Sequence, residues 1–86
     1  MGRDSTYEER LDNFRENLKK YAEDIERDKE RLREQGLLNA MTCSIIAEYY
    51  SMLIALDAVI LRIKGEDVDK VLKETIPKGI LSGDDL

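Results

Sequence analysis

The chain has 86 residues, of which 42% are hydrophobic and 38% are charged, and its formal net charge is −5. This length and balance predict one small folded domain, residues 1–86, rather than a disordered chain. The acidic charge argues against a nucleic-acid partner, which would require a basic surface, and against docking on an anionic membrane.

The numbers of cysteine, asparagine and glutamine residues indicate the environment in which the protein folds. Cys43 is the single cysteine, so the chain cannot form an internal disulfide, and its first residues do not read as a signal peptide. Both features favour a reducing cytoplasm, which we expect as the location. Asn and Gln are scarce beside Glu, Lys and Arg, a bias that is typical of thermophile proteins.

The first predicted helix covers residues 6–35. Ser5 and Glu8 have the spacing of a capping box, in which each side chain accepts a hydrogen bond from the other residue's backbone N–H. Apolar residues then recur at alternating intervals of four and three, which is a heptad seam, and Asp28 interrupts it. The seam consists of Tyr7, Leu11, Phe14, Leu18, Tyr21, Ile25 and Leu32. Because the rest of the segment is largely charged, this helix is expected to bury one narrow stripe.

A short connection joins it to a second helix, predicted over residues 39–64. Gly36 should end the first helix because glycine adopts the left-handed conformation, and Leu37 can then fold back onto Leu32. Asn39 is suited to cap the second helix. So short a connection places the two helices antiparallel, as a hairpin.

The second helix is apolar nearly all round. One face carries large side chains, namely Leu38, Met41, Ile45, Tyr49, Met52, Leu56, Val59 and Ile63. The other face is rich in small residues and consists of Ala40, Cys43, Ala47, Tyr50, Ile54, Ala58 and Leu61. The first helix and a short third helix are too small to cover both faces, and an uncovered apolar face of this size marks an interface.

The small-residue face is the predicted subunit interface of a homo-oligomer, most simply a dimer, because small residues let another helix approach closely. On this hypothesis Ala47→Glu and Ala58→Glu dissociate the oligomer, although the pattern alone leaves open which of the two faces meets the second subunit.

Residues 37–61 are also long enough to cross a bilayer. Glu48 and Asp57 would each cost about 2.5–3.5 kcal/mol near its centre, so no membrane is expected.

The third predicted helix covers residues 67–76. Gly65 is expected to end the second helix and Asp67 to cap the third, while Pro77 ends it because the residue before proline avoids the helical conformation. Ile80 and Leu81 are candidates for an apolar clip, and residues 82–86 are predicted to be a loose acidic tail.

Several kinds of chemistry are excluded by residue types that the chain lacks. It has no histidine, which removes Ser–His and Cys–His nucleophile pairs and histidine-containing metal sites. No glycine-rich phosphate loop is present, and no cofactor is expected.

Carboxylates remain as candidate metal ligands. Glu66 and Asp69 could share a Mg²⁺ as in helical nucleotide pyrophosphatases, provided that the first or second helix adds more ligands. By spacing, the candidates for these are Glu23, Glu26 and Glu30.

Asp57 is the unusual residue of the second helix. Its neighbours three and four positions away are Leu53, Ile54, Ile60 and Leu61, so its carboxylate enters an apolar setting. A buried carboxylate must be paired, hydrogen-bonded or protonated. We therefore expect an Arg, Lys or Tyr partner from the first helix or from a second subunit, and the less favoured interpretation is a ligand or acid–base group.

Residues 21–61 resemble a small archaeal domain family of unknown function that is built as a helical hairpin. The resemblance is carried by YAEDIERDKERL, Gly36, Ala40, the Tyr49–Tyr50 pair and the run Leu56-Asp57-Ala58. The segment AEYYSMLIAL also looks distantly similar to a core helix of HEPN domains, although the Arg-x₄₋₆-His motif of HEPN ribonucleases is absent. The resemblance implies a helical bundle without an assigned activity and supplies no site.

The sequence therefore predicts an all-α domain of three helices, a long antiparallel hairpin plus a short third helix, that assembles into a dimer. Its expected role is non-enzymatic self-association or protein–protein interaction. The alternative is a carboxylate–Mg²⁺ enzyme that acts on phosphates.

Overall fold

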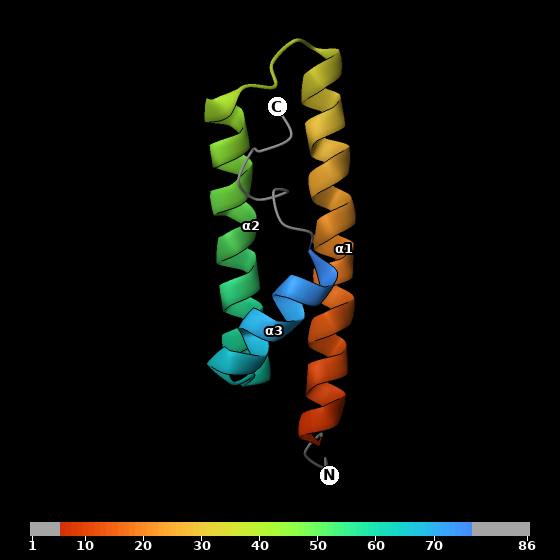
Figure 1. The fold of residues 1–86 in the computed structure, drawn as a ribbon, viewed down its shortest axis with the longest axis vertical. Coiled ribbons are helices and arrows are strands. Elements are labelled where there is room, and N and C mark those ends of the chain that lie inside the picture. Colours follow the sequence, from red (N-terminus) through yellow and green to blue (C-terminus); the bar gives the residue numbers. More distant parts are fainter. Residues whose placement is uncertain (1–5, 77–86) are drawn as a thin grey trace.

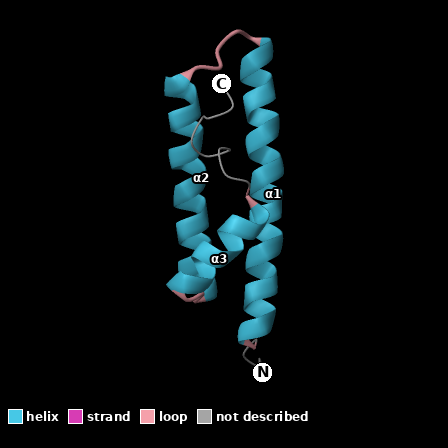
Figure 2. Cartoon of the chain, viewed as in Figure 1, coloured by secondary structure: helices cyan, strands magenta, loops and turns pink. Residues whose placement is uncertain are grey.

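The protein consists of three helices, as predicted, in a computed structural model that describes residues 6–76 (Figure 1). They are α1 (Tyr7–Glu34), α2 (Ala40–Leu61) and α3 (Gly65–Thr75). The first two run side by side in opposite directions, and α3 crosses the hairpin near its open end. All the regular structure in the described residues is helical (Figure 2).

A capping box begins α1, one residue later than predicted. Thr6 is the N-cap: its Oγ1 accepts a hydrogen bond from the Glu9 backbone N–H at 3.1 Å, and Glu9 Oε1 accepts one from the Thr6 N–H at 2.9 Å. The expected pair of Ser5 with Glu8 was therefore wrong in register, and Ser5 itself lies outside the described residues. Both pairs have suitable side chains, and the register that forms places Tyr7 in the first turn of the helix.

The connection between α1 and α2 confirms the predicted signals. Gly36 has φ +73°, and the Leu37 N–H donates to the Leu32 carbonyl at 2.8 Å, which closes the end of α1. Asn39 Oδ1 then accepts from the Thr42 N–H at 2.9 Å and caps α2.

The boundary between α2 and α3 differs from the prediction. Arg62, rather than Gly65, adopts the left-handed conformation with φ 57° and ends α2, and the Ile63 N–H donates to the Ala58 carbonyl at 2.9 Å. Ile63 is thereby buried in the core, which favours a reversal at this point. Gly65 is the first residue of α3, and Lys64 rather than Asp67 is its N-cap.

The end of α3 agrees with the sequence. Thr75 is its last residue, and Ile76 is extended with φ −116° and ψ 106°, as expected for a residue that precedes proline. Pro77, the proposed clip of Ile80 and Leu81, and the predicted tail 82–86 lie outside the described residues.

The buried side chains form two clusters along the hairpin. At the open end all three helices contribute Phe14, Leu18, Ile54, Ile63, Val71 and Ile76. Nearer the α1–α2 connection, the described residues form a smaller cluster of Ile25, Ile46 and Tyr50, from α1 and α2. In this part of the hairpin, residues 6–76 therefore form a single layer of helices.

The molecule is flat and elongated. Its principal extents are 51 × 24 × 16 Å and its Cα radius of gyration is 14.5 Å, whereas a compact domain of this length would have about 12 Å. A long helix in so thin an arrangement cannot be covered on all sides. In α2 the uncovered side is apolar.

Candidate interaction surface

The face that was predicted as the subunit interface lies inside the hairpin. Cys43, Tyr50 and Ile54 are buried, and Ala58 and Leu61 are half-buried beside the main cluster. Ala47 is also half-buried, and Ala40 is exposed at the start of α2. The small residues do admit a closely packed helix, but that helix is α1 of the same chain. A second subunit could reach the three buried side chains only if the hairpin opened, so the position expected for the contact is corrected.

The large-residue face of α2 is the one that remains uncovered. We define the outer face of α2 as seven large side chains that are each between 54% and 73% exposed: Met41, Ile45, Tyr49, Met52, Leu56, Val59 and Ile60. The expectation that α1 and α3 leave one face of this helix uncovered is thus confirmed. The Tyr49 ring packs edge-on against Tyr50, with centroids 5.1 Å apart, and so joins the outer face to the core.

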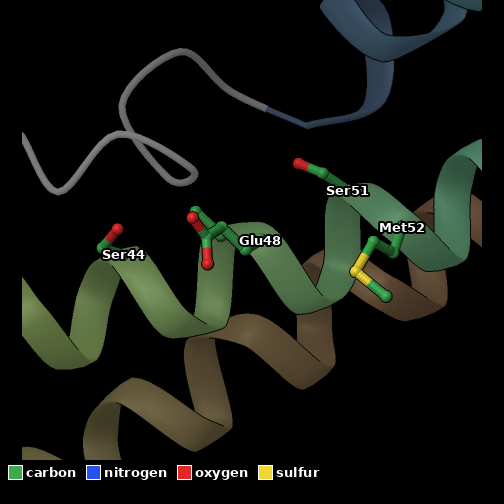
Figure 3. Close-up of a pocket in the computed structure, with 5 residues that line it drawn as sticks. Ser44, Glu48, Ser51 and Met52 are labelled. Carbon is green, nitrogen blue, oxygen red and sulfur yellow. The ribbon is translucent and has the colours of Figure 1, made fainter.

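A polar border runs along one side of the outer face. Ser44, Glu48 and Ser51 project from the same side of α2, with Met52 next to them, and together with Ala47 they line an open hollow of about 400 Å³ (Figure 3). Glu48 is the one charged group among the described residues that line it. These hydroxyl and carboxylate groups give the apolar surface a defined edge, as in the polar rim of a protein interface.

A second open hollow, of about 510 Å³, lies where α2 meets α3. Its lining includes Ala55, Val59, Arg62, Val68 and Asp69. Arg62 and Glu48 are both exposed, and neither forms an ion pair with any residue in the range 6–76. Glu48 therefore lies beside the middle of the outer face and Arg62 follows its last residue, and neither charge has an ion-pair partner within residues 6–76.

Asp57 is paired within the chain. Its Oδ2 accepts a hydrogen bond from the Tyr21 hydroxyl at 2.6 Å and another from Asn17 Nδ2 at 3.2 Å. Of the expected partners, an Arg, Lys or Tyr from the first helix or from a second subunit, the structure shows a tyrosine of the first helix. Burial, reinforced by the hydrogen bond to Asp57, raises the pKa of Tyr21 from 10.0 to about 12. The Asp57 carboxylate is half-buried, and these two hydrogen bonds satisfy it within an otherwise apolar segment.

Two further tyrosine–aspartate pairs were not predicted. The Tyr50 hydroxyl donates to Asp28 at 2.8 Å, and the Tyr7 hydroxyl donates to Asp67 while it accepts from the Lys64 N–H at 3.1 Å. Burial chiefly raises the pKa of Tyr50, and the hydrogen bond to Asp67 chiefly raises the pKa of Tyr7. The interruption of the α1 seam at Asp28 was a usable signal, because a carboxylate on a buried stripe requires a donor opposite.

The carboxylates proposed for a metal do not converge. Glu66 and Asp69 are exposed on α3, and Glu23, Glu26 and Glu30 are exposed on α1. Within residues 6–76 no three Asp, Glu or Cys side chains are placed to hold one ion. A Mg²⁺ enzyme would require at least three converging carboxylates, and residues 6–76 contain no such group.

In length and composition α2 could cross a membrane, and it is the one helix of the described chain that meets this test. Core helices of soluble proteins meet the same test. Glu48 would lie within the span, where a carboxylate costs about 2.5–3.5 kcal/mol. Absence of a membrane therefore stays a prediction, and it rests on this residue and on Asp57.

Comparisons of the chain with protein-family models, with curated proteins and with solved structures gave no match. The resemblance to an archaeal hairpin family accordingly stays a prediction.

Proposed function

We propose that the protein is a non-enzymatic helical domain that self-associates, as a homodimer, through the outer face of α2. The observation that supports this is the exposure of seven large apolar side chains on one helix, each more than half accessible to water. Soluble monomers rarely keep a contiguous apolar surface of this extent, because burying it against a partner is favourable at about 25 cal/mol per Å². The expected role is assembly or regulation in the cytoplasm.

A protein surface suits this face better than a small ligand does. The two hollows beside it are open rather than enclosed: the described lining of one comes from α2, and that of the other comes from α2, α3 and the turn between them. Sites for small molecules usually enclose most of their ligand. A flat apolar strip with a polar border instead matches the apolar core and polar rim of a protein–protein interface.

The test is the solution mass across a hundredfold dilution, measured by sedimentation or light scattering. We expect a dimer that dissociates on dilution. Met52→Glu places a charge at the centre of the outer face and should weaken association by about 30-fold or more, an effect of about 2 kcal/mol. Asn13→Glu adds the same charge to an exposed position of α1 and should leave the association unchanged.

Circular dichroism should report equal helix content for the two variants, because both substitutions are at exposed positions. A folded wild-type monomer at every concentration would contradict self-association. A dimer that Met52→Glu leaves intact would place the contact on another surface.

A further inference from the structure

The outer face of α2 carries a second heptad seam, on the side away from α1. Ile45, Tyr49, Met52, Leu56 and Val59 are separated by four, three, four and three residues. In heptad notation Tyr49 and Leu56 occupy a positions, and the other three occupy d positions. All five are more than half exposed. Alternation of this kind suits a helix that packs lengthwise against another helix with similar spacing.

The two flanks of this seam differ in chemistry. On one flank, Glu48 and Ala55 occupy g positions, and Arg62, which ends α2, lines the same hollow as Ala55. An acid therefore lies near the middle of α2, a base follows its end, and a small residue lies midway between them. The other flank, the e positions, is apolar and includes Leu53 and Ile60. Neither Glu48 nor Arg62 has an ion-pair partner among residues 6–76.

This pattern is self-complementary in only one orientation. When two copies of such a helix run antiparallel, a positions face d positions and the g flanks face each other. With Tyr49 set opposite Val59 and Leu56 opposite Met52, Glu48 of each copy falls beside Arg62 of the other, twice by symmetry. Ala55 then meets its own copy at the two-fold axis, where a small side chain permits close approach.

In a parallel pair the g flank faces the e flank instead. Glu48 and Arg62 would then lie beside apolar side chains such as Leu53 and Ile60, and their charges would find no complement. Parallel packing would also align the two helix dipoles, whereas antiparallel packing opposes them.

We propose that the partner of the outer face is a second copy of this chain, packed antiparallel along α2 with Glu48 of one copy paired to Arg62 of the other. This proposal rests on the proposed self-association and adds its orientation and register. It gives a reason for a helix that is apolar on two sides, since one side faces α1 and the other faces the α2 of the second copy.

The first experiment is oxidative cross-linking in a Cys43→Ala background, which removes the native thiol. Ala55→Cys alone should form a disulfide-linked dimer, because position 55 faces itself only in the antiparallel register. Ser51→Cys lies on the same helix and is also exposed, but outside the seam, and should remain unlinked. A link between Ala55→Cys and Ile60→Cys chains, without a link between two Ala55→Cys chains, would demonstrate parallel packing and overturn the proposal.

The second experiment reverses the charges. Glu48→Arg and Arg62→Glu should each weaken dimerisation about tenfold, because two exposed ion pairs are replaced by two repulsive pairs. The double variant should restore the dissociation constant to within about threefold of the wild-type value. A dimer that neither single variant weakens would overturn the register while leaving self-association intact. A monomeric wild-type protein would overturn both.

Discussion

Three tyrosine hydroxyls, each donating to an aspartate on another helix, fix how the helices of this molecule are aligned. Two of these bonds join α1 to α2. The hydroxyl of Tyr21 on α1 donates to Asp57 on α2, and the hydroxyl of Tyr50 on α2 donates to Asp28 on α1. Tyr7 joins the start of α1 to α3. A sliding movement of α1 along α2 by one turn would break the first two bonds and leave two half-buried carboxylates without these donors.

The Tyr21–Asp57 bond predicts a loss of stability at alkaline pH. The pKa of Tyr21 is about 12 in the folded chain and about 10 when it is unfolded, so its contribution is complete below pH 10 and decreases as the pH rises toward 12. Urea unfolding at pH 8 and pH 11 should show a larger loss of stability for the wild type than for Tyr21→Phe. Lysine titration and the other tyrosines affect both proteins alike. Equal losses would contradict the assignment.

Substitutions at Asp57 separate the need for an acceptor from the need for a charge. Asp57→Ala removes the acceptor of two hydrogen bonds and should lower the free energy of unfolding by about 1–3 kcal/mol. Asp57→Asn keeps an oxygen that can accept from the Tyr21 hydroxyl and should cost about 1 kcal/mol or less. Chemical denaturation measures both. If Asp57→Ala were neutral, the carboxylate would have no structural role.

At the scale of the elements, the two helix reversals use different residues for the same backbone conformation. Gly36 provides the left-handed residue after α1, as the sequence indicated, whereas Arg62 provides it after α2 although a glycine lies three positions away. The reversal at Arg62 brings Ile63 into the core. Gly65 is then included in α3, where its conformational freedom is of no use.

The two glycines should therefore respond oppositely to alanine. Neither has an atom within 4 Å of an added Cβ, so only the backbone conformation distinguishes them. Gly36→Ala places a side chain at φ +73° and should destabilise the fold by about 1 kcal/mol. Gly65→Ala, in the first turn of a helix, should stabilise it by about 0.4–1 kcal/mol. Thermal unfolding of both variants gives the comparison, and equal shifts in the same direction would contradict the assigned helix boundaries.

The periodicity of α1 was more informative than that of α2. The narrow stripe of α1 has one possible buried side, and Phe14, Leu18 and Ile25 along it are fully buried. By contrast, α2 has two apolar sides, and periodicity cannot rank them. The small-residue side packs on α1 because small side chains admit a close neighbour, and the nearest available helix is the one joined to it by a short connection.

At the scale of the whole molecule, the thin shape limits the core that a single chain builds within residues 6–76. Within the described range 6–76, the core at the open end of the hairpin is built from three helices, and toward the α1–α2 connection it comes from two. If a second copy covers α2, association and folding are linked, and the apparent stability depends on protein concentration.

The melting temperature should accordingly rise with concentration. Above the dissociation constant, a tenfold increase adds about 0.7 kcal/mol per chain, which corresponds to about 3–6 °C for a domain of this size. Calorimetry at three concentrations of the wild type and of Met52→Glu provides the test. Met52→Glu should show a smaller concentration dependence, and a wild-type melting temperature that does not depend on concentration would be the contradicting result.

The sequence by itself determined the helix count, the hairpin, the glycine turn, the Asn39 cap and the excess of apolar surface on α2, because each depends on local spacing or on one residue's conformational preference. Only the tertiary structure decided which side of α2 is exposed, where α2 ends, and that Tyr21, Tyr50 and Tyr7 each pair with an aspartate. These depend on which surfaces meet, and residues as far apart as Tyr7 and Asp67 come together only when α3 folds back across the hairpin.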